Sequence, residues 1–184
     1  MKLSRRLLPM SLLAVALAAS AIPLKADLAH SSVAAVFKQM NVPVEAKFKK
    51  FNAQVDYDAA KPETSKASVD IDTASLDLGD PEMNKEVAKK DWFNSAQFPK
   101  ASFVSSSIKP NGAGKLNVVG KLAIKGKSVD VNFPLTVKTE GGKQVFEGAL
   151  PIKRLAFNIG EGEWKDTSMV ADEVVIKFRV IAAQ

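Results

Sequence analysis

The chain has 184 residues, a length that suits one domain or at most two small ones. Hydrophobic residues make up 46% of it and charged residues 25%, which excludes disorder as the main state, and the absence of cysteine excludes disulfide scaffolds, thiolate zinc sites, iron–sulfur clusters and cysteine nucleophiles. A single histidine, His30, argues against a histidine-rich metal site.

The N-terminus has the order of a secretory signal peptide. Lys2, Arg5 and Arg6 precede an apolar run at residues 12–19, and small residues follow it. The run is too short to favour a permanent membrane anchor, and the lack of a cysteine behind it excludes a lipoprotein anchor. The sequence therefore predicts export with removal of this segment.

Cleavage is expected after Ala26, with Ala21 as the second choice, so that residues 1–26 form the signal and residues 27–184 the mature domain. The removed segment carries four basic residues, and the net charge of +6 therefore falls to about +2. A nearly neutral mature domain gives no support for a nucleic-acid partner.

The first strand pattern of the mature chain runs from Val42 to Tyr57. Apolar residues occupy every second position there, but the phase slips between Phe48 and Phe51. Such a slip predicts a bulge or bend near Lys49 and Lys50, as a strand needs when it turns a corner in a small barrel.

Four further segments alternate between apolar and polar residues, as antiparallel strands do when one face is wet. They are residues 67–71, 116–124, 129–137 and 174–180. Turn signals at Asn111–Gly112, Lys125–Lys127 and Glu140–Lys143 separate the later ones. Consecutive strands with tight turns predict an all-β meander, closed as a barrel or stacked as a sandwich.

One helix is expected, from about Pro81 to Lys90. Asp80 can cap it, Pro81 suits its first position, and Lys89 and Lys90 suit its negative end. The chain contains no internal repeat, and no linker is long enough to divide it. The sequence therefore predicts one all-β domain with a short helix near residues 80–90, inserted after the third or fourth strand.

Five segments in chain order resemble motifs of the YceI-like family. The most specific is Asp91–Phe103, which carries an aromatic pair and a Phe-Pro-x-x-x-Phe signature. The others are Ala29–Val33, Ala74–Gly79, Gly120–Gly126 and Arg154–Gly160. Together they cover roughly residues 27–184. In place of an Arg-Asp-x-His-like segment, residues 83–90 resemble a subgroup that includes proteins associated with b561-type membrane cytochromes.

The resemblance implies an eight-stranded antiparallel, lipocalin-like barrel with a long apolar cavity. It further implies a periplasmic protein that binds a polyisoprenoid lipid without catalysis and without a cofactor. On this basis the partner is a polyisoprenoid or quinone-type lipid, with a membrane cytochrome as a second candidate.

An eight-stranded barrel has the size at which the interior is either filled by side chains or holds one ligand. The same apolar residues can therefore form an ordinary core or the wall of a cavity. Trp92 can instead be a plug that closes one end of the barrel. The candidate ligand-binding residues are Phe37, Phe48, Phe51, Val69, Ile71, Phe93, Phe98, Phe103, Leu122, Ile124, Val131, Phe133, Leu135 and Phe178.

Catalytic and metal sites find little support. His30 and Ser31 are neighbours, which point to opposite faces of a strand, and no Gly-x-Ser-x-Gly elbow is present. Asp70, Asp72 and Asp77 lack the spacing of a calcium loop. The lysines at 47, 49 and 50 could meet a diphosphate or an anionic membrane, but a solvated strand face explains them equally.

Three functions remain open. The chain could be a periplasmic carrier of an isoprenoid lipid, a module that docks on a membrane cytochrome without free lipid, or a hydrolase of lipid-like substrates. An internal tunnel with a polar mouth favours the carrier. A filled core with an exposed apolar patch favours the docking module.

Overall fold

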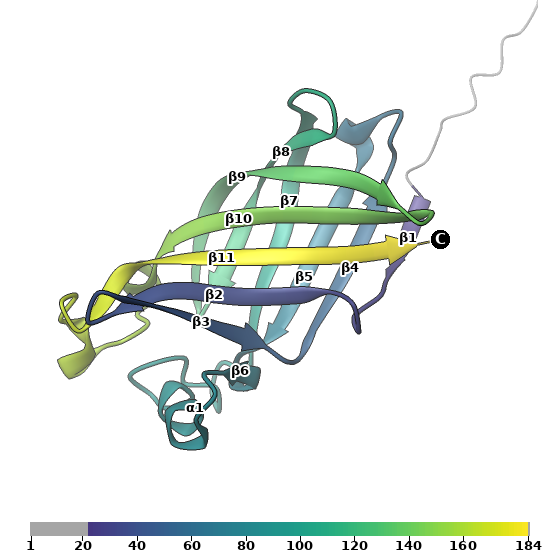
Figure 1. Ribbon diagram of the computed structural model, residues 1–184. Coiled ribbons are helices and arrows are strands. Elements are labelled where there is room, and N and C mark those ends of the chain that lie inside the picture. The colour runs from purple at the N-terminus through teal and green to yellow at the C-terminus, as the bar shows by residue number, and fades with distance from the viewer. Residues whose placement is uncertain (1–21, 184) are drawn as a thin grey trace, which may run out of the picture.

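A computed structural model describes residues 22–183, which form a β-barrel with one short α-helix at one end (Figure 1). The strands are β1 (Ile22–Ala26), β2 (Ser32–Gln39), β3 (Val42–Phe48), β4 (Phe51–Tyr57), β5 (Lys66–Asp72), β6 (Leu76–Asp77), β7 (Lys100–Pro110), β8 (Lys115–Ile124), β9 (Lys127–Glu140), β10 (Lys143–Lys153) and β11 (Val170–Ala183). The helices are α1 (Pro81–Val87) and the 3₁₀ turns η1 (Pro62–Thr64), η2 (Thr73–Ser75), η3 (Arg154–Phe157) and η4 (Gly162–Lys165).

The barrel is closed and eight-stranded, as the resemblance to the YceI-like family implies. The ring runs β1-β4-β5-β7-β8-β9-β10-β11 and returns to β1, and every neighbouring pair is antiparallel. Three of these strands are interrupted and then continue: β1 continues as β2, β4 is preceded by β3, and β5 continues as β6. β2 pairs with β11, and β3 pairs with both β2 and β6. Three of the eight strands are therefore long strands broken near the middle.

The predicted bend at Lys49 and Lys50 is confirmed as one of these breaks. β3 ends at Phe48 and β4 begins at Phe51. The two residues between them leave the strand ladder, and their backbone N–H groups donate to the backbone oxygen (3.0 Å) and Oγ (3.1 Å) of Ser75 in η2. These hydrogen bonds replace the ladder partners that the two exposed residues of the bend lack, and they fasten the bend to η2.

A second irregularity lies between β9 and β10, which pair along only part of their length. Pairing stops at Leu135 and Gly148, although β9 begins at Lys127 and β10 continues to Lys153. Pro134 comes next on β9 and Pro151 lies farther along β10. Because proline has no N–H to donate to a ladder, both residues favour divergence of the two strands toward the α1 end, where Figure 1 shows them apart.

Helix α1 begins where the sequence predicts and ends earlier than Lys90. Asp80 Oδ1 accepts from the backbone N–H groups of Glu82 (2.7 Å) and Met83 (3.1 Å), a standard N-cap. After Val87 the chain turns back on itself, since the N–H of Phe93 donates to the carbonyl of Val87 (3.0 Å). These turns carry Trp92 and Phe93 from the helix into the interior cluster of the barrel.

Five strands were not among the alternating segments: β1, β2, β6, β7 and β10. β7 carries four serines and β10 has glycine and proline in its ladder, so neither shows a clean apolar period. Within residues 22–183 no helix is long and apolar enough to cross a membrane.

Candidate functional site

The interior of the barrel holds three small cavities in a row, and each shares lining residues with the next. The helix-end cavity, about 170 Å³, lies against α1 and is lined among others by Phe37, Leu76, Met83, Trp92 and Trp164. The middle cavity, about 90 Å³, shares Ala35, Phe93, Arg154, Ile159 and Val174 with it. The far cavity, about 110 Å³, shares Val69, Ile71, Phe103, Leu122 and Ile176 with the middle one. The first and third share no residue, so the order along the barrel is helix-end, middle, far.

Three phenylalanine rings from three strands meet in the interior at the far cavity. Phe133 of β9 lies 5.5 Å from Phe103 of β7 and 5.7 Å from Phe178 of β11, both edge to face. We call these three rings the aromatic partition. Two of them lie over glycines, since a Cβ at Gly120 would come within 2.5 Å of the Phe103 ring and one at Gly148 would collide with Phe178. The glycines are therefore required for the rings to lie flat against the wall.

Most of the predicted ligand-binding residues line these cavities, and three do not. Those at a cavity wall are Phe37, Phe48, Val69, Ile71, Phe93, Phe103, Leu122, Ile124, Phe133, Leu135 and Phe178. Phe51 and Val131 pack against the core clusters without bordering a cavity, and Phe98 lies over Gly126 in the β8–β9 turn. Alternation identifies the inward face, but it does not tell which inward residues meet empty space. Ligand binding by the eleven stays a prediction.

The helix-end cavity has the most polar groups at its wall, although Arg154 and Ser102 also border the middle cavity. Gln39, Glu86 and Arg154 all border it. The far cavity has Ser65 as the one non-aromatic polar lining residue and Tyr57 as the one phenol, whose pKa is raised by burial. A ligand that carries both an apolar tail and a polar head would therefore fit with its head at the α1 end.

Among the described residues, Arg154 is the one cation at the wall of the helix-end cavity, and nothing in the sequence pattern pointed to its role. Its side chain is 2% exposed and donates to five backbone carbonyls: Nε to Ala171 (3.1 Å), Nη1 to Ile159 (2.8 Å) and Gly160 (3.1 Å), Nη2 to Trp164 (2.7 Å) and Val170 (2.8 Å). All five N–H groups of the guanidinium are thus in use. Burial lowers the pKa of Arg154, and the charge of Asp172 partly offsets that effect.

The loop that receives Arg154 is held in place from two sides. Lys125 donates to the carbonyl of Asn158 (2.7 Å) and to Glu161 (2.9 Å), and it is almost fully buried. The carbonyl of Asp91 accepts from the N–H groups of Gly160 and Glu161, both at 2.8 Å. Gly160 has φ +78° and a Cβ there would collide with Arg154, so glycine alone fits. The motif Arg154–Gly160 therefore has a structural reason: its arginine binds the backbone of the loop, and its glycine leaves room for the guanidinium.

Trp92 is buried at this end of the barrel, a position that is compatible with the plug interpretation. Its ring is 9% exposed, packs against Trp164 with 5.3 Å between ring centroids, and lies 5.7 Å from the Arg154 guanidinium carbon. Within the part of the chain that the structure describes, the Trp92 indole nitrogen is the only buried side-chain polar atom without a hydrogen-bond partner. Buried donors without a partner are rare and mark strain, function or an absent ligand.

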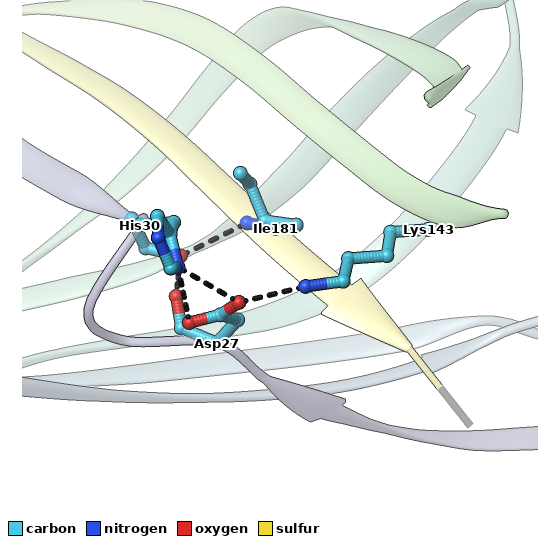
Figure 2. A network of polar contacts seen from close by, with 5 residues as sticks. Asp27, His30, Lys143 and Ile181 are labelled. Atoms are coloured by element: carbon cyan, nitrogen blue, oxygen red, sulfur yellow. Dashed lines mark hydrogen bonds and ion pairs between the residues drawn. The ribbon is translucent and has the colours of Figure 1, made fainter. Parts of the chain in front are cut away.

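The serine–histidine pair considered for hydrolysis is not formed. His30 Nδ1 lies 3.0 Å from both carboxylate oxygens of Asp27, which also accepts from Lys143 (2.9 Å), as Figure 2 shows. Ser31 Oγ donates to the Asp27 carbonyl (2.7 Å) and accepts from the Ile181 N–H (2.9 Å). The network lies in the loop between β1 and β2, and the His30 side chain is 71% exposed. It therefore fastens that loop to β10 and β11.

The aspartates considered for calcium accept hydrogen bonds from backbone N–H groups or form ion pairs with lysines. Asp72 caps η2 by accepting from Ala74 N–H (3.0 Å), and Asp70 lies 3.7 Å from Lys100. Asp77 pairs with Lys49 (2.7 Å), and together with Asn84 and Gly79 this hydrogen bonding lowers its pKa to about 2. Among residues 22–183 no group of three or more acidic or histidine side chains could hold a metal ion.

Comparison with known proteins places this geometry in a family. The sequence profile of the YceI-like domain matches residues 24–182. The crystal structure of BcnA from Burkholderia cenocepacia superimposes with a TM-score of 0.85 at 58% identity, over 86% of this chain and all of that one. A polyisoprenoid binding domain from Saccharophagus degradans, implicated in plant cell wall breakdown, shares the fold with a TM-score of 0.68 at 15% identity, over 88% of this chain and 97% of its own.

Curated relatives match over a shorter stretch. A UPF0312 protein of Pseudomonas fluorescens is 40% identical over 98 residues, which is 53% of this chain and 51% of the relative. The chain thus spans about half the length of the curated relatives it matches.

Proposed function

Because this chain belongs to the YceI-like domain family, we propose that it is a non-catalytic binding protein that holds a polyisoprenoid lipid, such as an isoprenoid or quinone tail, inside its barrel. One observation carries the proposal: the interior is not filled, but contains three cavities with predominantly apolar walls in a row from α1 to the opposite end. Dry apolar cavities attract hydrocarbon, since each square ångström of apolar surface removed from water contributes about 25 cal/mol. The name of the Saccharophagus domain supports the same ligand class.

The tail would lie along the barrel and the head group at α1. The cavities are separate, so a long tail requires side chains shared by neighbouring cavities, such as Phe93 and Phe103, to change rotamer. The separating residues are single side chains, which rotate in nanoseconds to microseconds when they are not tightly packed. A short tail needs only the helix-end and middle cavities.

The proposal includes export to the periplasm. The signal-like segment falls on residues 1–21, outside the described residues, and on β1. Export would place the protein between two membranes, where a lipid with a long apolar tail needs a carrier to cross water.

Binding to polyprenyl alcohols of increasing length tests the function. Protein refolded from denaturant, and so freed of lipid, should bind a chain of about three isoprene units at micromolar concentrations in native mass spectrometry. A water-soluble alcohol without the isoprene tail is the matched control ligand. Absence of binding at every length overturns the proposal.

A second function is favoured by one surface feature. Met40 and Val42 at the β2–β3 hairpin are 63% and 62% exposed, and Met169 lies beside them because its carbonyl accepts from the Met40 N–H (2.8 Å). Such a group suits docking on another protein, for which we propose a membrane cytochrome as the candidate partner. Replacing Met40 and Val42 by serine should abolish cytochrome binding and leave lipid binding unchanged if both functions exist.

A further inference from the structure

The exposed apolar residues of the α1 end adjoin the lining of the helix-end cavity. Gln39 of β2 and Val170 of β11 form the last ladder pair at this end, and both line the cavity. Met40 and Met169 are the next residues beyond that pair, and Met169 is 44% exposed. Val42 of β3 pairs with Gln39 and is exposed as well. Apolar side chains therefore continue the cavity wall outward from β2, β3 and β11.

Helix α1 adds a fourth apolar side chain to this group. Met83 borders the cavity and is 41% exposed, so the cavity wall reaches the surface of the molecule at this residue. We call Met40, Val42, Met83 and Met169 the apolar rim. All three methionines among residues 22–183 belong to it. Methionine is flexible and polarisable, and it is common on surfaces that contact apolar partners of variable shape.

The turn that carries Met40 is an unfavourable place for a methionine. Met40 and Asn41 connect β2 to β3, and their φ angles are +46° and +65°. Two-residue hairpin turns with positive φ at both positions favour asparagine, aspartate and glycine, because other side chains are strained there. Asn41 follows this preference, whereas Met40 does not. Strain at an exposed apolar residue indicates a role other than stabilising the fold.

We propose that the apolar rim docks on the surface of a lipid bilayer and that the ligand passes between bilayer and barrel across it. This inference rests on the proposed lipid-binding function, since a membrane lipid must leave a bilayer to enter the cavity. Immersing the rim among acyl chains removes apolar side chains from water, and it shields the tail of the ligand on its way. Docking on a protein would not require the contact residues to adjoin the ligand cavity.

The charges beside the rim favour adhesion through apolar contacts. Lys85 of α1 pairs with Glu82 (2.7 Å). Lys89 pairs with Glu86 (2.5 Å) in the same way, so these charges cancel. Anionic bilayers attract proteins chiefly through clusters of lysine or arginine, and salt screens that attraction. Four apolar side chains give weak and reversible binding that resists salt, which suits a carrier that must leave the membrane again.

Sedimentation with phosphatidylcholine vesicles measures the docking. Protein that spans residues 22–184 should bind at millimolar lipid, and equally well at low and high salt. Met40→Asn should weaken binding about fivefold, because one exposed apolar side chain no longer enters the bilayer. Adding Val42→Thr should weaken it by more than about tenfold in total. Val104→Ser is the matched control, at an outward position of β7 that is 56% exposed, and should leave binding unchanged.

Two further measurements separate docking from folding and from ligand affinity. In urea unfolding, Met40→Asn should be at least as stable as the unaltered protein, because asparagine suits positive φ. A purely structural role of Met40 predicts a loss of stability instead. The affinity for a short polyprenyl alcohol in solution should not change, whereas its transfer from vesicles to the protein should slow about fivefold.

Oxidation tests the rim without a substitution. Hydrogen peroxide transfers one oxygen atom to each thioether sulfur and leaves water, and the resulting sulfoxide is polar. From residue 22 onward the chain has methionine only in the rim, and it has no cysteine. Mildly oxidised protein should therefore lose vesicle binding, and methionine sulfoxide reductases should restore it.

The outcomes distinguish the rim from the lipid-binding function. Vesicle binding that the rim variants leave unchanged, or that high salt abolishes, overturns the inference and leaves a cytochrome as the partner of these residues. The lipid-binding function stands in that case if the alcohol binds in solution. Failure of the alcohol to bind overturns the proposed function, while vesicle sedimentation still decides whether the rim docks.

Discussion

Arg154 shows how much of the α1 end depends on a single side chain. It joins η3 to the loop at residues 159–164 and to the start of β11, and it does so through backbone carbonyls alone. The motif at residues 154–160 contains this residue, but an arginine between apolar neighbours has the same sequence pattern whether its side chain is exposed or buried. Five acceptors that converge on one guanidinium arise only from tertiary structure.

Replacing Arg154 by lysine should lower the free energy of unfolding by about 3 kcal/mol or more, because one ammonium cannot reach carbonyls that a planar fork satisfies. Urea unfolding measures the loss. The matched control is Arg179→Lys, which affects a partly exposed pair with Glu147 and Glu140 and should cost about 0–1 kcal/mol. Equal losses in the two variants would show that burial of Arg154 is unimportant.

Acid should destabilise the barrel through Asp27 and Asp77. Hydrogen bonds from Lys143 and His30 lower the pKa of Asp27 from 3.8 to about 2, and Lys49 and Asn84 do the same for Asp77. Because the unfolded carboxylates bind protons first, this contribution is present above pH 4 and is lost as the pH falls toward 2.

Urea unfolding at several pH values between 2 and 5 measures how steeply the free energy of unfolding falls with pH. A variant that combines Asp27→Asn and Asp77→Asn should be less stable at pH 5 and should show a shallower slope. Asp58→Asn is the control, because Asp58 accepts only from the backbone N–H groups of Ala60 and Lys61 and has no basic side chain as a partner among residues 22–183. An unchanged slope in the double variant would assign the acid sensitivity to other groups.

At the scale of elements, β1 decides where the mature protein should begin. β1 pairs with β4 along four residues and with β11 along two, and its Leu24 and Ala26 pack against the interior cluster. Cleavage after Ala26 would remove this strand and leave the edges of β4 and β11 unpaired. Cleavage after Ala21 keeps it, so the second of the two expected sites is the one that the barrel favours.

The mature N-terminus is therefore expected at Ile22, which N-terminal sequencing of exported protein determines. Protein that starts at Asp27 should be less stable than protein that starts at Ile22 by about 1–2 kcal/mol, since it loses the partly buried Leu24 together with the pairing of β1. Urea unfolding of the two recombinant forms compares them. Retention of Met1 in exported protein would contradict cleavage altogether, and equal stability would remove the argument for Ala21.

The sequence predicted elements best where one face is apolar and the other wet. β8, β9 and β11 alternate over most of their length, and the phase slip at Phe48 and Phe51 located a real bend. The pattern did not predict β7 and β10, because serine, glycine and proline interrupt their alternation of apolar and polar residues. The end of α1 was placed too late, since Lys89 and Lys90 suit a helix end but the backbone turns back at Val87 to seat Trp92.

For the whole molecule, the barrel was predictable and the division of its interior was not. Which inward residues line a void depends on volumes summed across several strands, as Phe51 and Val131 show by packing without bordering a cavity. The orphaned Trp92 nitrogen is likewise a property of its surroundings. The number of cavities and their order could therefore come only from three-dimensional packing.

Filling the far cavity should shorten the ligand that the barrel accepts. Leu135→Trp adds bulk at its wall, so binding of a short polyprenyl alcohol should persist while affinity for a longer one falls about tenfold. Val104→Trp, at an outward position of β7, is the control and should change neither. Native mass spectrometry against both lengths gives the answer, and an unaltered length preference would confine the tail to the helix-end and middle cavities.

The seam between β1 and β11 also governs the order of folding. Two residue pairs join β1 to β11 and seven more join β11 to β2, which continues β1, and all of them connect segments that lie far apart along the chain, as does the hydrogen bond from Ile181 N–H to Ser31 Oγ. Bringing such distant segments together costs loop entropy that grows with the logarithm of their separation, so the hairpins of consecutive strands should form first and the seam last. An open sheet with two free edges precedes the closed barrel on this route. A substitution at the seam, such as Ala182→Gly, should therefore speed unfolding in stopped-flow measurements and leave the rate of folding nearly unchanged.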